Sequence, residues 1–200
     1  MKQHRLRIKG PAGAIETVLD LPAGPPRGVA LIAHPHPLHG GSLDNKVVAT
    51  LAKAALAGGE VAVRANFRGV GATAGEYDAG IGETEDLLTV AQAVQAAFPD
   101  LPWRLLGFSF GAFVQHRVAA RWPARQLILV GPALGRFDFA PPPIPAAIVH
   151  GADDELIPLA QVADYARAHA IPLRVIPGAS HFFHGKLMEL KTAVAEMCCG

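Results

Sequence analysis

Short apolar runs recur along the chain and alternate with longer segments in which apolar residues return every three or four positions. The short runs are rich in β-branched residues, which is typical of strands buried on both faces of a sheet. They predict six strands, at 28–33, 60–66, 104–107, 126–130, 146–150 and 173–176. The helical periodicity between them predicts helices at 44–57, 83–97, 112–121, 159–168 and 182–197. This alternation predicts an α/β fold with a doubly wound, mostly parallel sheet.

Two further strand-like pieces precede this pattern, at 6–9 and 15–19, and a Gly-Pro-Ala-Gly turn separates them. They predict an N-terminal antiparallel hairpin on a sheet edge. Residues 131–145 contain Gly, Pro and Phe but no amphipathic segment of helix length. We therefore expect residues 1–200 to form a single domain without a cap over its site, with Phe137 and Phe139 as walls of an open pocket.

Composition narrows the classes of function. Half of the 200 residues are hydrophobic, enough for a substantial core, and the formal net charge is +1 without a basic block, so we expect no nucleic-acid partner. The chain has no apolar run of the length that spans a bilayer and no signal-peptide pattern, so we expect no membrane association. The only cysteines, Cys198 and Cys199, are adjacent, which disfavours a disulfide and suggests a reducing, cytoplasmic environment.

The sequence Gly-Phe-Ser-Phe-Gly at 107–111 joins a predicted strand to a predicted helix. A serine framed by glycines at such a junction is typical of a nucleophile held on a tight turn, where larger flanking side chains would collide. Ser109 is therefore the candidate nucleophile. A serine hydroxyl needs a histidine base, which in turn needs an acid to orient it.

Candidates for both partners follow later strands, where the carboxyl ends of a parallel sheet collect active groups. Three adjacent carboxylates, Asp153, Asp154 and Glu155, follow the strand predicted at 146–150, and His181 follows the strand at 173–176. The residues alone do not separate the three acids, and His184 competes with His181 as the base. Helix capping near Pro158 is the alternative role for Asp153 and Glu155.

Five segments together resemble the α/β-hydrolase superfamily over nearly the whole chain, and in particular a small, capless, dienelactone-hydrolase-like group. They are HPHPLHGG (34–41), NFRGVG (66–71), GFSFG (107–111), HGADDE (150–155) and GASH (178–181). The resemblance implies a triad of Ser109, Asp154 and His181. It also implies a small-molecule ester or thioester as substrate, and the oligomeric state stays open.

Stabilising the oxyanion of such a reaction requires backbone N–H groups. Phe110, which follows the candidate nucleophile, is the first candidate donor. In the segment 34–37 the prolines have no N–H to donate, so His36 is the second candidate, by position and by the same resemblance. The three histidines at 34, 36 and 39 are an alternative metal site, which the prolines and the lack of nearby acids disfavour. We expect neither a metal nor a cofactor.

A glycine-rich segment at 69–75 lacks the lysine and hydroxyl residue of a phosphate loop, so we interpret it as part of the pocket rim. The preceding Arg68 either steers an anionic substrate or pairs with Glu76, Glu83 or Asp86.

The resulting hypothesis is a serine hydrolase that forms an acyl-enzyme on Ser109. Two alternatives stay open at this point. One is a non-catalytic binding protein with the same fold, and the other is an acyltransferase that uses the same three residues.

Overall fold

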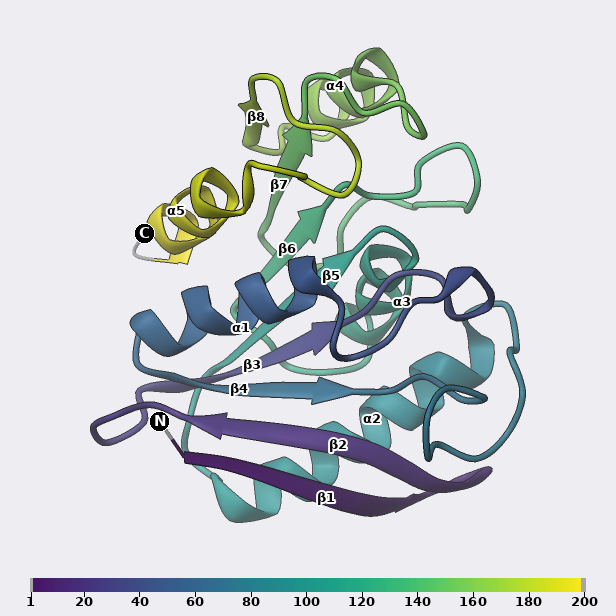
Figure 1. Cartoon of the computed structure of the whole chain (residues 1–200), viewed down its shortest axis with the longest axis vertical. Coiled ribbons are helices and arrows are strands. Elements are labelled where there is room, and N and C mark those ends of the chain that lie inside the picture. The colour runs from purple at the N-terminus through teal and green to yellow at the C-terminus, as the bar shows by residue number, and fades with distance from the viewer. Residues whose placement is uncertain (1, 199–200) are drawn as a thin grey trace.

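The computed structural model describes residues 2–198 and arranges them in three layers, with helices on both faces of an eight-stranded sheet (Figure 1). The strand order is β1-β2-β4-β3-β5-β6-β7-β8. β1 pairs antiparallel with β2 and β2 antiparallel with β4, whereas every other neighbouring pair is parallel. The strands are β1 (Lys2–Gly10), β2 (Gly13–Leu21), β3 (Gly28–Ala33), β4 (Glu60–Ala65), β5 (Trp103–Phe108), β6 (Gln126–Val130), β7 (Ala146–Gly151) and β8 (Leu173–Ile176). The predicted doubly wound sheet with an N-terminal antiparallel hairpin is confirmed.

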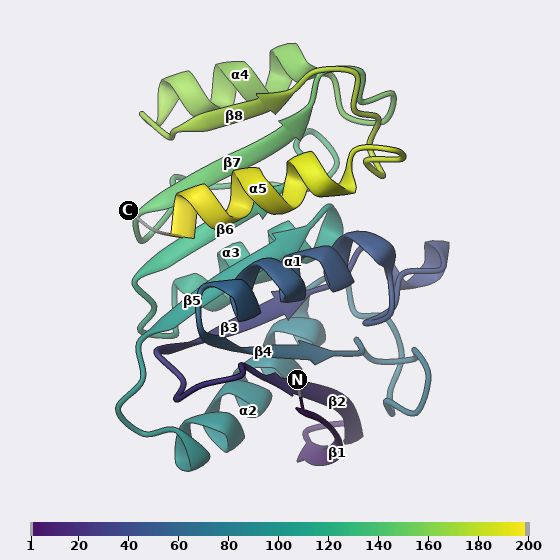
Figure 2. The same cartoon turned by 60° about the vertical axis from the view of Figure 1, so that its left-hand side comes forward.

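Five α-helices in the described part of the chain cover the sheet: α1 (Lys46–Ala57), α2 (Ile81–Ala97), α3 (Phe110–Ala119), α4 (Leu159–Ala168) and α5 (Leu187–Cys198). α1 and α5 lie side by side on one face (Figures 1 and 2), and their apolar side chains share one core cluster. Side chains of α2, α3 and α4 belong to the cluster on the other face.

Adjacent residues of the central strands point into different cores. In β5, Leu105 packs into the cluster under α2 and α3, and Leu106 packs into the cluster under α1 and α5. Leu31 and Ile32 of β3 divide in the same way. Because both faces are covered, the strands are apolar at nearly every position, which explains the continuous runs in the sequence.

The order in which strands are added to the sheet reverses next to β3. β4 lies on one side of β3, and β5, which leads toward the opposite edge, lies on the other. In open α/β sheets the crevice at such a point, beyond the carboxyl ends of the strands, is where ligands bind. The segments that follow β3 and β5 contain His36 and Ser109 respectively.

The helix predicted at 182–197 begins later than expected, at Leu187. Phe183 and Gly185 have φ angles of 53° and 71°, in the left-handed region, and turns replace helix from 182 to 186. Phe183 is buried in the core, and its apolar side chain extended the helical pattern of the sequence toward residue 182. The other helix ends lie within two residues of their predicted positions, and α4 has the predicted bounds.

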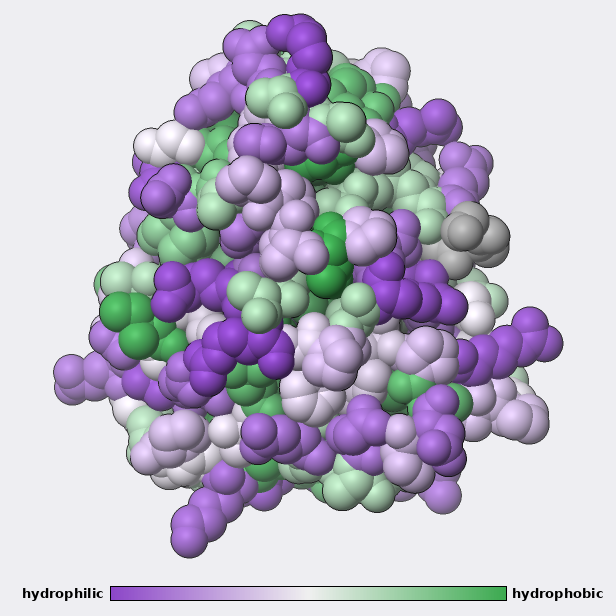
Figure 3. Space-filling model, turned by 180° about the vertical axis from the view of Figure 1, so that it is seen from behind, coloured by the Kyte–Doolittle hydropathy of each residue, from purple (hydrophilic) through white to green (hydrophobic). Residues whose placement is uncertain are grey.

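Residues 131–145 form an irregular segment without a helix, as expected for a protein without a cap. Figure 3 shows the opposite side of the molecule from Figure 1, where small hydrophobic areas are separated by hydrophilic ones. Within residues 2–198, none of the helices is both long and apolar enough to cross a membrane. The expectation for the cysteine pair concerns Cys199, which lies outside the described residues.

Candidate active site

Ser109 lies on a sharp turn between β5 and α3, with φ 56° and ψ −116°. A Cβ atom on Gly107 would lie 2.3 Å from the carbonyl oxygen of Gly111. A Cβ atom on Gly111 would lie 2.4 Å from the carbonyl oxygen of Ala33, at the end of β3. Neither position has room for a side chain, so both glycines of the motif are required by the close approach of three backbone segments.

The turn brings Ser109 to His181 and Asp154, which come from the segments after β8 and β7. The Ser109 hydroxyl lies 3.0 Å from Nε2 of His181, and Nδ1 of the same ring lies 2.7 Å from Oδ2 of Asp154. An ionised carboxylate only accepts, so Nδ1 carries the proton, and the lone pair of Nε2 accepts from the serine O–H. The three residues form one continuous hydrogen-bonded chain, with His181 and Asp154 buried and Ser109 half-buried.

The loop after β7 selects Asp154 from the three adjacent acids. Its Oδ1 accepts hydrogen bonds from the N–H groups of Leu156 and Ile157, at 2.9 and 2.8 Å, while Oδ2 faces His181. Burial by itself would raise the pKa of the Asp154 carboxyl. The hydrogen bonds from His181 and the two backbone amides outweigh burial and hold that pKa below its ordinary value, so the group is a carboxylate at neutral pH.

The helix-capping role considered for Asp153 and Glu155 is wrong. The N-cap of α4 is Pro158, and no side chain there accepts a capping hydrogen bond. Glu155 instead accepts the backbone N–H of His181 at 3.1 Å, which ties the histidine loop to the acid loop. His184, the competing base, is exposed and precedes α5, so it does not share a helical face with His181.

A second buried imidazole lies behind the acid. Nε2 of His150 is 3.0 Å from the Ile157 carbonyl oxygen, to which it donates, and 3.6 Å from Oδ2 of Asp154. Burial lowers the pKa of His150, although Asp154 and the carbonyl act in the opposite direction. His150 is therefore neutral at neutral pH and holds the segment that supplies the amide donors to Asp154.

His36 opens the turn that follows β3. Its carbonyl oxygen accepts hydrogen bonds from the N–H groups of His39 and Gly41, both at 3.1 Å. Its ring lies 4.9 Å from the ring of Phe110, so the turn abuts the residue after Ser109. Within residues 2–198 no acceptor is in range of the His36 N–H, and Phe110 begins α3, where an N–H has no intrahelical acceptor.

His34 braces this turn from inside. Its Nδ1 donates to the Pro35 carbonyl at 2.7 Å, and its Nε2 accepts the Phe67 N–H at 2.9 Å. Both ring nitrogens are occupied, and burial lowers the pKa of His34 to about 4. In the part of the chain that the structure describes, no group of three His, Cys, Asp or Glu side chains is arranged to hold a metal.

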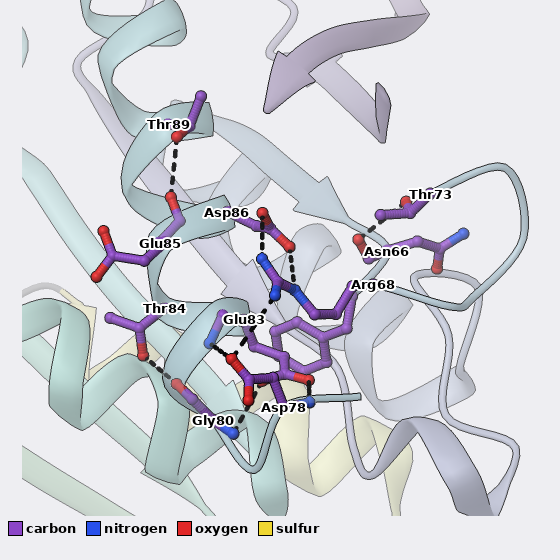
Figure 4. A network of polar contacts seen from close by, with 12 residues as sticks. Asn66, Arg68, Thr73, Asp78, Gly80, Glu83, Thr84, Glu85, Asp86 and Thr89 are labelled. Atoms are coloured by element: carbon purple, nitrogen blue, oxygen red, sulfur yellow. Dashed lines mark hydrogen bonds and ion pairs between the residues drawn. The ribbon is translucent and has the colours of Figure 1, made fainter. Parts of the chain in front are cut away.

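Arg68 is part of a structural network rather than of the pocket (Figure 4). Its Nε and Nη2 donate to both carboxylate oxygens of Asp86, at 2.9 and 3.0 Å. Of the predicted partners Glu76, Glu83 and Asp86, it is therefore Asp86 that forms the ion pair. Glu83 accepts the backbone N–H groups of Asp78 and Gly80 in the same network. The ion pair attaches the segment after β4 to α2.

The glycine-rich segment at 69–75 does not form the pocket rim that we expected. It packs on the N-terminal hairpin, where Ala74 donates to the Ala14 carbonyl at 2.8 Å and Thr73 accepts the Glu16 N–H at 3.0 Å. Tyr77, a few residues later, does reach the site, with its ring 4.8 Å from that of His36.

A pocket of about 340 Å³ opens above Ser109. Phe137 is one of its walls as predicted, whereas Phe139 packs into the core against Phe113. The apolar walls are Phe110, Ala133, Phe137, Leu156 and Ile157.

The polar residues that face this pocket are His36, His39, Ser109, Arg136 and His181. We did not predict from the sequence that Arg136, Leu156 and Ile157 line the pocket. They lie in irregular loops, where no hydrophobic periodicity indicates which side chains face a cavity. A larger hollow of about 570 Å³ lies at the amino ends of β6 and β7. It contains none of the hydrogen-bonded chain from Ser109 to Asp154.

Sequence comparison finds a relative of this chain but no matching family model. An uncharacterized protein of Rickettsia prowazekii (strain Madrid E) is 34% identical over 207 residues, which cover 96% of this chain and 87% of that protein.

Two solved structures are more informative. An α/β serine hydrolase without lid from Xanthomonas campestris has a TM-score of 0.94 and 37% identity, over 98% of this chain and 93% of that one. An α/β serine hydrolase homologue from Coxiella burnetii has a TM-score of 0.93 and 40% identity, over 98% of both chains.

Proposed function

The chain belongs to the α/β serine hydrolases without a lid, and on this premise we propose that it hydrolyses carboxylic esters or thioesters through an acyl-enzyme on Ser109. The observation that carries the proposal is the unbroken chain of hydrogen bonds from Ser109 through His181 to Asp154. This chain begins at the floor of a pocket large enough for a small acyl group. An ordinary buried serine has no need of a base that is itself oriented by a carboxylate.

In the first half of the proposed reaction, Ser109 Oγ attacks the carbonyl carbon while its proton passes to Nε2 of His181. Asp154 holds the imidazole in the required tautomer and stabilises its positive charge. The carbonyl oxygen becomes an oxyanion, and the free N–H groups of His36 and Phe110 are the donors we assign to it.

Collapse of the tetrahedral intermediate breaks the bond to the alcohol or thiol, which takes the proton from His181 and leaves. In the second half a water molecule gives a proton to His181 and attacks the acyl-enzyme. Collapse then returns that proton to Ser109 and releases the carboxylic acid. The pocket is open to water because no lid covers it, so water can reach the acyl-enzyme.

Steady-state hydrolysis of 4-nitrophenyl acetate and of an acetyl thioester tests the proposal. We expect turnover by the unmodified protein and a loss of about 10⁴-fold or more in kcat for Ser109→Ala. The chain has two other serines, so Ser42→Ala and Ser180→Ala are matched controls that should retain turnover. Folded protein without any turnover of either substrate would instead favour the binding-protein alternative.

A further inference from the structure

Within residues 2–198, the side chains that line the pocket above Ser109 include a positive charge and no negative charge. Among the described residues that line it, Arg136 is the only lysine or arginine, and there is no Asp or Glu. Three acids lie within two residues of a lining residue in sequence, and none of them pairs with Arg136. Asp154 bonds Nδ1 of His181, and Glu155 bonds the N–H of His181. Asp138 lines a separate hollow with His116 and Arg117. The space that a substrate enters is therefore bordered by an uncompensated cation.

A tight turn fixes Arg136 at the pocket. The N–H groups of Arg136 and Phe137 both donate to the Ala133 carbonyl at 3.2 Å, and Gly135 has the φ angle of 74° that this turn requires. The guanidinium Nη2 lies 3.5 Å from the Leu156 carbonyl oxygen, on the loop after β7. The side chain thus spans from one wall of the pocket to the other.

Arg136 differs from the chain's buried and paired arginines. Arg64 and Arg68 bond Asp20 and Asp86 at 2.7 and 2.9 Å, whereas no carboxylate of the described chain lies within 4.0 Å of the Arg136 guanidinium. The contact with Leu156 is long and uses one of the five N–H donors of the guanidinium. The other N–H donors remain available to bind the carboxylate of a ligand. Arg136 is exposed, so water screens the attraction, and the expected gain is that of an ion pair at the surface.

We propose that the substrate is an ester or thioester that carries an anionic group, such as a carboxylate, which Arg136 binds while Ser109 attacks the ester. This inference rests on the proposed function and adds a substrate class to it. A neutral chain of the same size fills the pocket without this ion pair, and a cationic chain is repelled.

Pairs of substrates that differ only in charge test the inference. One pair is 4-nitrophenyl monoadipate and the neutral 4-nitrophenyl 6-methylheptanoate, in which an isopropyl group replaces the carboxylate. A second pair, 4-acetoxybenzoate and 4-acetoxybenzamide, puts the charge on the leaving group. The readout is the ratio of kcat/KM for the anionic and the neutral member, which cancels any general effect of a variant on turnover.

We expect Arg136→Gln to lower this ratio by about three- to fivefold in at least one pair, and Arg136→Glu to lower it by about tenfold. Arg136→Lys should fall between the wild type and Arg136→Gln, because it keeps the charge without the fork. Arg7→Gln removes the same charge on β1, at the far edge of the sheet, and should leave the ratio unchanged. Raised salt should lower the ratio of the wild type and not that of Arg136→Gln.

A ratio that stays within about twofold for Arg136→Gln and Arg136→Glu in both pairs would overturn the inference, while turnover of the neutral esters would still support the proposed function. If the wild type cleaves none of these four esters, nor 4-nitrophenyl acetate or the acetyl thioester, the proposed function fails. Calorimetric titration with monomethyl adipate then decides the inference separately. Weaker binding to Arg136→Gln than to Arg7→Gln supports it, and equal binding refutes it.

Discussion

Gly111→Ala is the substitution whose outcome follows most directly from the geometry of the turn. The new Cβ would lie 2.4 Å from the Ala33 carbonyl oxygen and 2.5 Å from that of His34. Real Cβ atoms essentially never come within 3.0 Å of an atom of a residue that is not their neighbour in the chain. The start of α3 and the end of β3 must therefore separate by roughly 0.6 Å or more. Both segments are backbone, so no side chain can rotate to relieve the contact.

Overpacking of this kind typically costs about 1–3 kcal/mol, which corresponds to a fall in Tm of about 2–12 °C for a domain of this size. Helix propensity acts in the opposite direction, because alanine in a helix is favoured over glycine by about 1 kcal/mol. The sign of the change in Tm therefore reports whether the close contact exists. The same displacement moves the His36 turn away from Phe110, and a misplacement approaching 1 Å can cost about 10²-fold in rate.

The assay combines thermal unfolding by circular dichroism with kcat for 4-nitrophenyl acetate, normalised to folded protein. Gly24→Ala is the matched control, because its Cβ would meet no atom within 4 Å, and we expect no loss of stability or activity. For Gly111→Ala we expect a lower Tm and a kcat reduced by about 10- to 100-fold. A raised Tm with unchanged kcat would refute the account of the turn.

Three further predictions concern buried charge. Asp154→Asn should lower kcat by about 10⁴-fold, because the amide stabilises the wrong histidine tautomer, whereas Asp153→Asn should have a mild effect in the same assay. The pKa of His34 falls from 6.5 when unfolded to about 4 when folded, so the unfolded chain binds more protons below pH 6.5 and stability falls between pH 6.5 and 4. Urea unfolding across this range should show a loss that is about 3 kcal/mol smaller for His34→Gln than for the wild type. Asp86→Asn removes the carboxylate that bonds a mostly buried guanidinium and should cost about 3 kcal/mol in urea unfolding, whereas Glu85→Gln breaks an exposed pair and should cost less than about 1 kcal/mol.

The strands and the serine turn could be predicted because their signals are local. A strand that is buried on both faces must be apolar throughout. A serine on a tight turn must have small neighbours, so the residues at 107–111 by themselves indicate the backbone conformation there. The segment at 182–186 shows where local signals fail. Its aromatic residues imitate a helix, but the positive φ angles that end this pattern depend on how the loop packs after His181.

The choice among the three acids illustrates the same limit within the site. Asp153, Asp154 and Glu155 have the same charge and adjacent positions, so their chemistry does not distinguish them. The distinction arises when the loop folds back and presents the N–H groups of 156 and 157 to Asp154. Arg136 had no sequence signal at all, because its place at the pocket comes from a turn in an irregular segment.

The identity of the residue that becomes acylated is the central claim, and a fluorophosphonate probe tests it most directly. Intact mass spectrometry of the folded protein should show one adduct per chain, and peptide mapping should place it on Ser109, with no adduct on folded Ser109→Ala. An adduct on Ser42 or Ser180, or no adduct on the folded wild type, would contradict the account.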